Sequence, residues 1–436
     1  MKRGLSVSTS VPEISSEGWI GGRIAWLLVV PIMLGSLIGL FVSGLSWLFE
    51  SQLLDRLIGS ASPWTALVLL AALPLSVLSM RFVAGTLTPS TNEFYIIHSN
   101  VDDGRRMPLR QIPGRVLAGG VTVACGGAQG MESPSASLGA GIGILFERFF
   151  GRSLAPRERG LLMKAGASAA IATIFSSPGV GAVYGMEVSY RRGFDARPIV
   201  QATLAAVAAF TVRYLTVGLD PLIPFVDVNV HLDSRLVWTA LLLALVCGFS
   251  ARAFASIANL ARGWRKRVRP WIGVATGSLA LASIAICVWF WTGSWLTLGT
   301  GHAMFDWAMD TPRAILMLLA MLLLHAAATI ICVFGGGGGG VFTSLAATGA
   351  LVGCITSSLM GTPDELFLPL VGAACLLSAA YRIPIAGMLL IVEWGGGMES
   401  ALLGLVCIAV SQSCMGRITI APAQVDAPGA PEPERP

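Results

Sequence analysis

Charged residues are scarce in this sequence. Asp, Glu, Lys and Arg make up 12% of its 436 residues, whereas hydrophobic residues make up 54% and the mean hydropathy is +0.74. A soluble protein has roughly 25% charged residues, so this chain has too few to cover a surface that faces water. A helix needs roughly 17–25 apolar residues to cross a bilayer. The chain has apolar runs of about this length at Ile24–Leu48, Pro63–Leu78, Leu236–Phe249, Trp271–Trp291 and Ala314–Phe334. The sequence therefore predicts an all-α polytopic membrane protein.

Sequence signatures of enzymes and metal centres are absent as well. The eight cysteines stand singly among apolar residues, without the spacing of metal ligands, and are interpreted as small packing residues. The sequence has no HExxH, GxSxG or GxxxxGKS/T motif. This weighs against an intramembrane protease, a lipid hydrolase and an ATP-driven pump. We therefore expect no enzymatic activity, no cofactor and no bound metal.

The few basic residues predict how the chain lies in the membrane. Lys2, Arg3 and Arg23 precede the first apolar run, and five more basic residues gather in the segment 262–269. Cytoplasmic segments of membrane proteins are enriched in Lys and Arg. We therefore expect both segments on the cytoplasmic side of the cell inner (plasma) membrane. This explanation is favoured over binding of nucleic acid, which is not expected as a partner.

Two stretches of the chain repeat one spacing of glycine, proline and glutamate. A glycine at position 130 or 340 is followed by glycines nine and thirteen residues later. A proline at position 178 or 384 is followed by a glycine three residues later and a glutamate nine residues later. These agreements indicate two homologous halves. We divide the chain into a cytoplasmic N-terminal segment (1–22), a first membrane repeat (23–218), a second membrane repeat (219–425) and a short Pro-rich tail (426–436).

The repeated glycines also predict a pair of broken helices. The breaks fall at Gly130–Pro134 and at Phe334–Ser344, which includes six consecutive glycines. A helix that starts inside the bilayer presents unpaired N–H groups and the positive end of its dipole, and both suit an anion. Paired interrupted helices mark the binding site in many membrane carriers. Glycines further along each helix, at 139, 143, 349 and 353, are interpreted instead as sites of close helix packing.

In this order, the motifs resemble those of the CLC family of chloride channels and chloride/proton antiporters, in a divergent form of prokaryotic type. GTLTP (85–89) takes the place of the family's GSGIP, GMESP (130–134) that of GREGP, and GGVFTS (339–344) that of GGxFxP. The stretches around Pro178 and Pro384 resemble the family's two AxxxNAPLxGxxFxxE-type helices. The resemblance covers residues 23–425 and implies a CLC-like fold of two inverted repeats with broken, tilted helices. It also implies a homodimer in the lipid bilayer, with a chloride pore in each subunit.

The resemblance assigns roles to seven residues. Glu132 takes the position of the gating glutamate, whose carboxylate occupies an anion site when ionised and swings away when protonated. Its alternative role is to cap the start of its own helix. Thr86 takes the position of an anion-coordinating serine, and its alternative role is also that of a helix cap. The other residues expected to contact the anion are Gly130, Met131, Gly340, Val341 and Phe342.

Departures from the family's pattern bear on the mechanism. Val188 stands where the family's antiporters have an inner glutamate that passes protons, and Ala421 stands where a tyrosine hydroxyl contacts the anion. We therefore expect transport of chloride or a similar inorganic anion that is passive or weakly coupled to protons. The alternatives are a proton-coupled antiporter of chloride or fluoride, a carrier of small organic anions, and a scaffold that no longer transports. Glu187 and Glu393, related by the repeat, are expected to be structural acids bound by backbone N–H groups.

Overall fold

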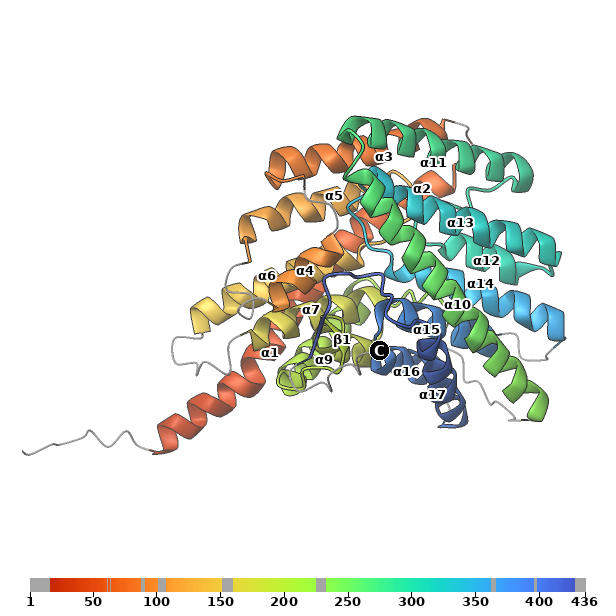
Figure 1. The fold of residues 1–436 in the computed structure, drawn as a ribbon. Helices are drawn as coiled ribbons and strands as arrows, with labels where there is room; N and C mark the ends of the chain where they lie inside the picture. The colour runs from red at the N-terminus through yellow and green to blue at the C-terminus, as the bar shows by residue number, and fades with distance from the viewer. Residues whose placement is uncertain are drawn as a thin grey trace, which may run out of the picture.

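The structure of the chain is a computed structural model (Figure 1). It describes residues 16–60, 62, 64–87, 91–100, 107–150, 160–224, 233–361, 366–395 and 398–427. Among these residues helices dominate, and the one sheet consists of two short parallel strands, β1 (Tyr190–Arg192) and β2 (Val425–Asp426). The prediction of a mostly helical membrane protein with several spans is confirmed. The repeat boundary at 218–219 remains a prediction, and β2 crosses the boundary at 425–426.

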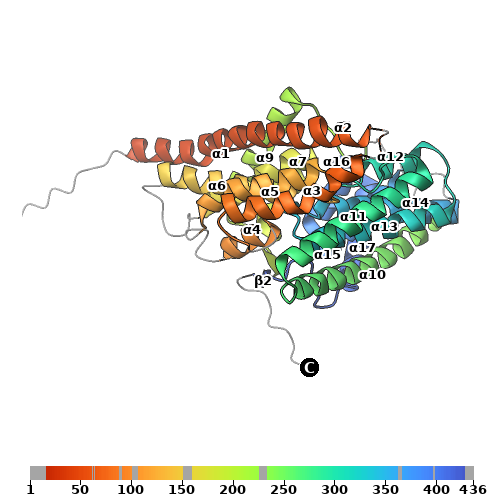
Figure 2. The same ribbon diagram turned by 90° about the horizontal axis from the view of Figure 1, so that it is seen from above.

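The first half of the chain forms helices that surround two central ones, α6 and α7. Figure 2 shows this half, in red to yellow, beside the second half in green to blue. Its elements are α1 (Ser16–Ser46), η1 (Trp47–Leu54), α2 (Asp55–Ile58), α3 (Thr65–Leu78), η2 (Ser79–Val83), α4 (Thr91–Asn100), η4 (Leu109–Gln111), α5 (Ile112–Ala124), α6 (Glu132–Phe150), α7 (Leu161–Phe175), α8 (Pro178–Glu187), β1 and α9 (Ile199–Thr216).

The second half repeats this arrangement around α14 and α15. Its elements are α10 (Ser234–Arg265), α11 (Pro270–Thr292), α12 (His302–Asp310), α13 (Ile315–Gly335), α14 (Phe342–Met360), α15 (Phe367–Tyr381), α16 (Pro384–Gly395), α17 (Met398–Ser413) and β2. The expected apolar runs in this half lie in α10, α11 and α13. Both predicted helix breaks are present, since α6 begins at Glu132 and α14 begins at Phe342.

Within the described residues, seven helical segments are long and apolar enough to cross a membrane. In six of them, 33–44% of the most apolar 18-residue window is buried, whereas in α14 the buried share is 83%. The six therefore leave apolar side chains uncovered, which suits contact with lipid, and α14 is enclosed by protein. A helix start enclosed in this way can present its N–H groups to an ion and not to lipid.

Glycines bring α6 and α14 close to their neighbours. A Cβ atom at Gly139 would lie 2.1 Å from the carbonyl oxygen of Gly166 in α7, and one at Gly349 would lie 2.3 Å from that of Gly372 in α15. One turn later, the same close approach is found at Gly143 and Gly353. Small residues stabilise helix pairs in membranes because the backbones can approach. The close-packing interpretation of these glycines is confirmed.

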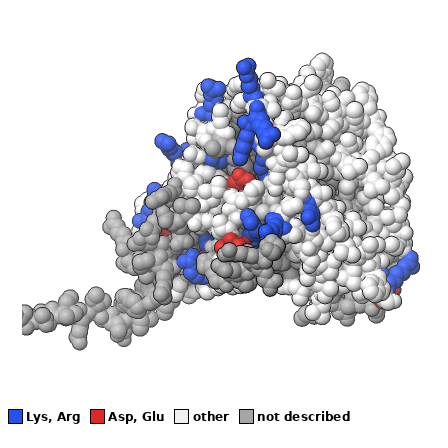
Figure 3. All heavy atoms as spheres, in the orientation of Figure 1, with Lys and Arg blue, Asp and Glu red and all other residues white. Residues whose placement is uncertain are grey.

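The basic segment 262–269 joins the end of α10 to the start of α11. Figure 3 shows Lys and Arg side chains gathered on one face of the molecule, over this junction. Two of the side chains bind backbone carbonyls: Arg262 donates to Ile420 (2.8 Å) and Arg265 to Phe334 (3.4 Å) near the end of α13. These two arginines therefore hold other segments of the chain in place. The positive charge of Arg265 also interacts favourably with the negative end of the α13 dipole.

Candidate anion site

The two glycine turns predicted from the repeat lie directly against each other. The N–H of Gly130 donates to the carbonyl of Gly340 (3.0 Å), and the N–H of Gly340 donates to that of Gly130 (2.7 Å), in an isolated antiparallel bridge. The bridge places the first residues of α6 and α14 side by side. Both helices therefore direct their unpaired first-turn N–H groups toward one region inside the protein.

The Glu132 carboxylate lies in this region, at the start of α14. Its side chain is 1% exposed, and Oε1 accepts a hydrogen bond from the N–H of Thr343 (2.7 Å) and another from the Thr343 hydroxyl. Thr343 is the second residue of α14, so the acid binds the helix of the other half of the chain. Among the described residues, Oε2 of Glu132 has no hydrogen-bond partner. A negative charge at a helix N-terminus is stabilised by the helix dipole.

Glycine at both turns makes room for this carboxylate. A Cβ atom at Gly340 would lie 2.3 Å from Oε2 of Glu132, and one at Gly130 would lie 2.5 Å from Oε1. Any side chain at either position would therefore displace the acid. We call Gly130, Gly340 and Thr343, the three residues that hold or border the carboxylate, the Glu132 seat. A site that fits two carboxylate oxygens beside helix N–H groups has the chemistry of an anion site.

The other predicted anion-contact residues differ in what they can offer to an anion at the Glu132 seat. Val341 and Phe342 are the N-cap and first residue of α14, so their N–H groups have no partner within the helix. The side chain of Met131 is fully buried in a hydrophobic cluster and can contribute only through its backbone. The N–H of Thr86 donates a hydrogen bond to the carbonyl of Met80 (3.0 Å). Two residues of the GTLTP motif, Thr88 and Pro89, lie outside the described residues.

Three aromatic rings pack against the side chain of Phe342, the first residue of α14. The centroid of the Phe342 ring lies 4.6 Å from that of Phe175, 5.2 Å from that of Tyr381 and 5.9 Å from that of Tyr184. The two tyrosines are less than 5% exposed and were not singled out from the sequence. Both stand in the stretches around Pro178 and Pro384, and their position in those repeated segments is the signal that could have found them.

Two acids in the last turns of α8 and α16 each cap the start of the other helix. Glu187 accepts hydrogen bonds from the N–H groups of Ile385 and Ala386 (both 3.0 Å) at the start of α16. Glu393 accepts one from the N–H of Gly179 (2.6 Å) at the start of α8, and another from the Ser177 hydroxyl. Each acid therefore satisfies first-turn N–H groups of the other helix. The geometry agrees with the prediction that both are structural.

We expect Glu187→Ala to lower the free energy of unfolding by roughly 2–4 kcal/mol, because two hydrogen bonds to a charged acceptor are lost and two buried N–H groups remain unpaired. Thermal unfolding of the purified protein in detergent, followed by tryptophan fluorescence, measures the change. Glu187→Gln keeps one oxygen acceptor and should lose less. Unchanged stability of Glu187→Ala would show that this acid does not stabilise the fold.

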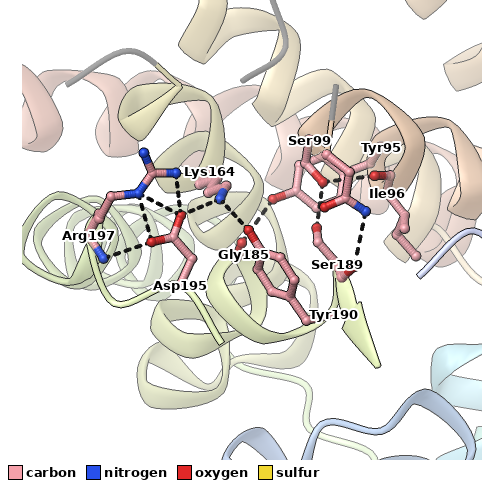
Figure 4. Close-up of polar contacts among 10 residues, drawn as sticks. Tyr95, Ile96, Ser99, Lys164, Gly185, Ser189, Tyr190, Asp195 and Arg197 are labelled. Carbon is pink, nitrogen blue, oxygen red and sulfur yellow. Dashed lines mark hydrogen bonds and ion pairs between the residues drawn. The ribbon is translucent and has the colours of Figure 1, made fainter. Parts of the chain in front are cut away.

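The segment that follows Val188 in the sequence, which includes Ser189 and Tyr190, takes part in a cluster of polar contacts (Figure 4). Lys164 of α7 donates to Oδ2 of Asp195 (2.5 Å) and to the hydroxyl of Tyr190 (3.1 Å), and Arg197 also binds Asp195 (2.8 Å). The side chains of Lys164 and Asp195 are 1% and 7% exposed. Burial raises the pKa of Asp195, but the hydrogen bonds from Arg197 and Lys164 more than offset it and hold this pKa well below its usual range.

This cluster ties together segments that are distant in the sequence. Beside the ion pair, Tyr95 of α4 donates to the carbonyl of Gly185 (3.2 Å), and the hydroxyls of Ser99 and Ser189 share a hydrogen bond (2.5 Å). The segment between α8 and α9 is thereby bound to both α4 and α7. Sequence analysis did not single out Lys164, although a lone lysine in the apolar stretch of α7 was a usable signal.

The chain matches known proteins in both sequence and fold. Residues 71–416 match the family model described as voltage gated chloride channel. A slow cyanobacterial Cl⁻/H⁺ antiporter of known structure has a TM-score of 0.79 and 19% identity, covering 91% of this chain and 96% of its own. A CLC-type fluoride/proton antiporter has a TM-score of 0.71 and 20% identity, covering 95% of this chain and 100% of its own. A eukaryotic CLC transporter has a TM-score of 0.74 and 16% identity, covering 92% of this chain and 74% of its own. At these identities the likeness establishes the fold, and the expected fold of broken helices is confirmed.

Proposed function

The chain belongs to the voltage gated chloride channel (CLC) family, and we propose that it conducts chloride or a similar inorganic anion under the control of Glu132. Its function is anion transport of the CLC type, without enzymatic activity. The single observation that carries the finer proposal is the position of the Glu132 carboxylate. It lies at the N-terminus of α14 and between two glycines, and any side chain in place of either glycine would displace it.

A carboxylate in this position competes with an anion. The N–H groups at the start of α14 attract any negative charge, and the Glu132 seat has room for only one. Protonation removes the charge of Glu132 and weakens its hold on Thr343, so that an anion can take its place. Partial charges of helix ends bind an anion weakly enough for it to leave, which conduction requires. We propose that the anion then contacts Thr86, Gly130, Met131, Gly340, Val341 and Phe342.

The proposed transport is passive or weakly coupled to protons. Val188 is fully buried and carries no group that can hold a proton at the position of the family's inner glutamate. Ala421, also buried, supplies no hydroxyl to the anion. Both departures support conduction without a fixed proton ratio. We further propose that the protein works as a homodimer in the cell inner membrane, with the basic segment 262–269 on the cytoplasmic side.

Proton-coupled antiport is the second candidate function. Two structures with the same fold are named as antiporters, one of chloride and protons and one of fluoride and protons. Because their identity to this chain is 19–20%, the shared fold supports this candidate less than the missing inner glutamate opposes it.

Efflux from chloride-loaded liposomes tests the two candidates. We expect the purified protein to release chloride when a potassium ionophore allows charge to balance, while the external pH stays constant. Proton uptake in a fixed ratio to chloride would support antiport instead. Repeating the experiment with fluoride inside tests the anion. Absence of flux with either anion would contradict the proposed function.

A further inference from the structure

A polar pocket lies beside the Glu132 seat. Its wall includes Glu50 of η1, Arg213 of α9, Asp220, His302 of α12 and Thr343 of α14. The pocket has a volume of about 40 Å³ that is accessible to water. On this measure, about 10–15 Å³ is enough for one water molecule. It is therefore large enough for several waters or a small hydrated anion.

The pocket connects the surface of the protein to the gate. Asp220 on the pocket wall is exposed, whereas Thr343, which lines the same pocket, is 6% exposed and binds Glu132. Ser46, also on the wall, ends α1, and the start of α1 belongs to the N-terminal segment that we place on the cytoplasmic side. The pocket therefore opens toward the opposite, outer face.

A serine hydroxyl on the pocket wall bridges a buried arginine and a glutamate. The Ser46 hydroxyl donates to Oε2 of Glu50 (2.5 Å) and accepts a hydrogen bond from Nη1 of Arg213 (3.4 Å). Arg213 is 5% exposed, and its Nε has no hydrogen-bond partner among the described residues. A buried guanidinium that lines a polar pocket is able to bind an anion through the N–H groups that face the pocket.

The charges around Glu50 decide whether that arginine attracts anions. Glu50 interacts electrostatically with Glu132 from α6, with Arg213 from α9 and with Asp220 from the segment after α9. His302, which lines the same pocket from α12, shares a hydrogen bond with Thr300 (2.7 Å). With Glu50 ionised, the two acids on the wall outweigh the one arginine. With Glu50 protonated, the charges of Arg213 and Asp220 balance, and the pocket no longer repels an anion.

We propose that Arg213 and Glu50 form a proton-controlled anion site in this outer pocket, through which chloride reaches the Glu132 seat. A proton taken from the outer solution by the Glu50 carboxylate frees Arg213 to hold an anion next to Thr343. Loss of that proton returns the negative charge, which pairs with Arg213 and excludes the anion. This inference rests on the proposed function, because it assigns the access route to the same gate.

Chloride flux at low chloride concentration, with the same pH on both sides of the liposome, tests the inference independently of protein orientation. The variant Glu132→Gln serves as background, since its gate no longer responds to protons. In this background we expect flux to rise about tenfold between pH 8 and pH 5, since protonation of Glu50 removes the net negative charge that repels anions, and the field of a charged cleft changes the local ion concentration by factors of about 10–1000. Adding Glu50→Gln should hold the flux at the acid level throughout, and adding Arg213→Gln should keep it at or below the alkaline level at every pH.

Asp310→Asn is the matched control, because Asp310 is an exposed acid in α12 that does not line the pocket. It should leave the pH profile of the background unchanged. The inference is overturned if the pH profile persists in Glu50→Gln, or if Arg213→Gln reaches at pH 5 the flux of the background. If Glu50→Gln does not fold, the Arg213→Gln result decides alone. Absence of chloride flux from every variant would overturn the proposed function and this inference with it.

Discussion

Glu132→Gln is expected to raise chloride flux at neutral pH by about tenfold and to remove the steepest part of its pH dependence. The ionised acid binds the start of α14 through hydrogen bonds to a charged acceptor, each worth about 1.5–3 kcal/mol. A glutamine has no charge to oppose the helix dipole and competes less well with an anion. Since about 1.4 kcal/mol corresponds to a tenfold change in an equilibrium, loss of one such interaction accounts for the expected effect. Chloride efflux from liposomes between pH 5 and pH 8 measures it.

Two further variants make this prediction specific. Glu132→Asp keeps the charge, and its flux should remain pH-dependent although its shorter side chain reaches Thr343 less well. Gly340→Ala places a methyl group where the carboxylate and the anion that replaces it would both lie, so it should lower flux at every pH without changing the acid itself. If Glu132→Gln conducts like the wild-type protein at every pH, Glu132 does not gate the pore.

Asp195→Asn is expected to lower the free energy of unfolding by about 3–5 kcal/mol, because it leaves the buried charge of Lys164 without its partner. Lys164 is 1% exposed and its ammonium group lies 2.5 Å from Asp195, so it cannot reach water without opening the cluster of Figure 4. Because the pKa of Asp195 is held below its usual range, the stabilisation is present above the unfolded-state pKa of about 3.9. It is lost as the pH falls from there through the folded-state pKa. Thermal unfolding between pH 3 and pH 7 measures both effects.

Removing both charges should rescue the fold. In Lys164→Met with Asp195→Asn no ion is left unpaired in the interior, so we expect a stability closer to that of the wild-type protein than of Asp195→Asn alone. Asp310→Asn, at an exposed position, should change stability little. Equal unfolding temperatures for the wild-type protein and Asp195→Asn would mean that the ion pair contributes nothing to stability.

Much of the architecture follows from local patterns in the chain. Apolar runs of membrane length identify helices because the bilayer excludes unpaired backbone groups. The repeated glycine spacing predicts the two helix starts at Glu132 and Phe342, because only glycine permits such close backbone approach. The repeat also predicts Glu187 and Glu393 as matched structural acids. In each case the determining interaction acts within one helix or is encoded twice in the two halves.

Contacts between distant segments were decided only by the tertiary structure. No spacing in the sequence shows that Gly130 bonds to Gly340, or that the Glu132 carboxylate binds Thr343 in the other half of the chain. The pairing of Lys164 with Asp195 joins a helix to a loop 31 residues away. The meeting of Glu50 with Arg213 joins two helices through Ser46.

The physical reason is the same for all of these contacts. The sequence by itself determined where helices start, stop and pack closely, because helix formation and glycine packing depend on neighbours in the chain and on the solvent. Which buried charges meet depends on how the two halves of the chain are oriented against each other. That orientation sets the distance between groups far apart in sequence, and electrostatic interactions in a protein interior depend steeply on this distance and on burial. The proposed gate at Glu132 was therefore visible in the sequence, whereas the binding of its carboxylate to Thr343 and the proposed outer access route emerged only from the fold.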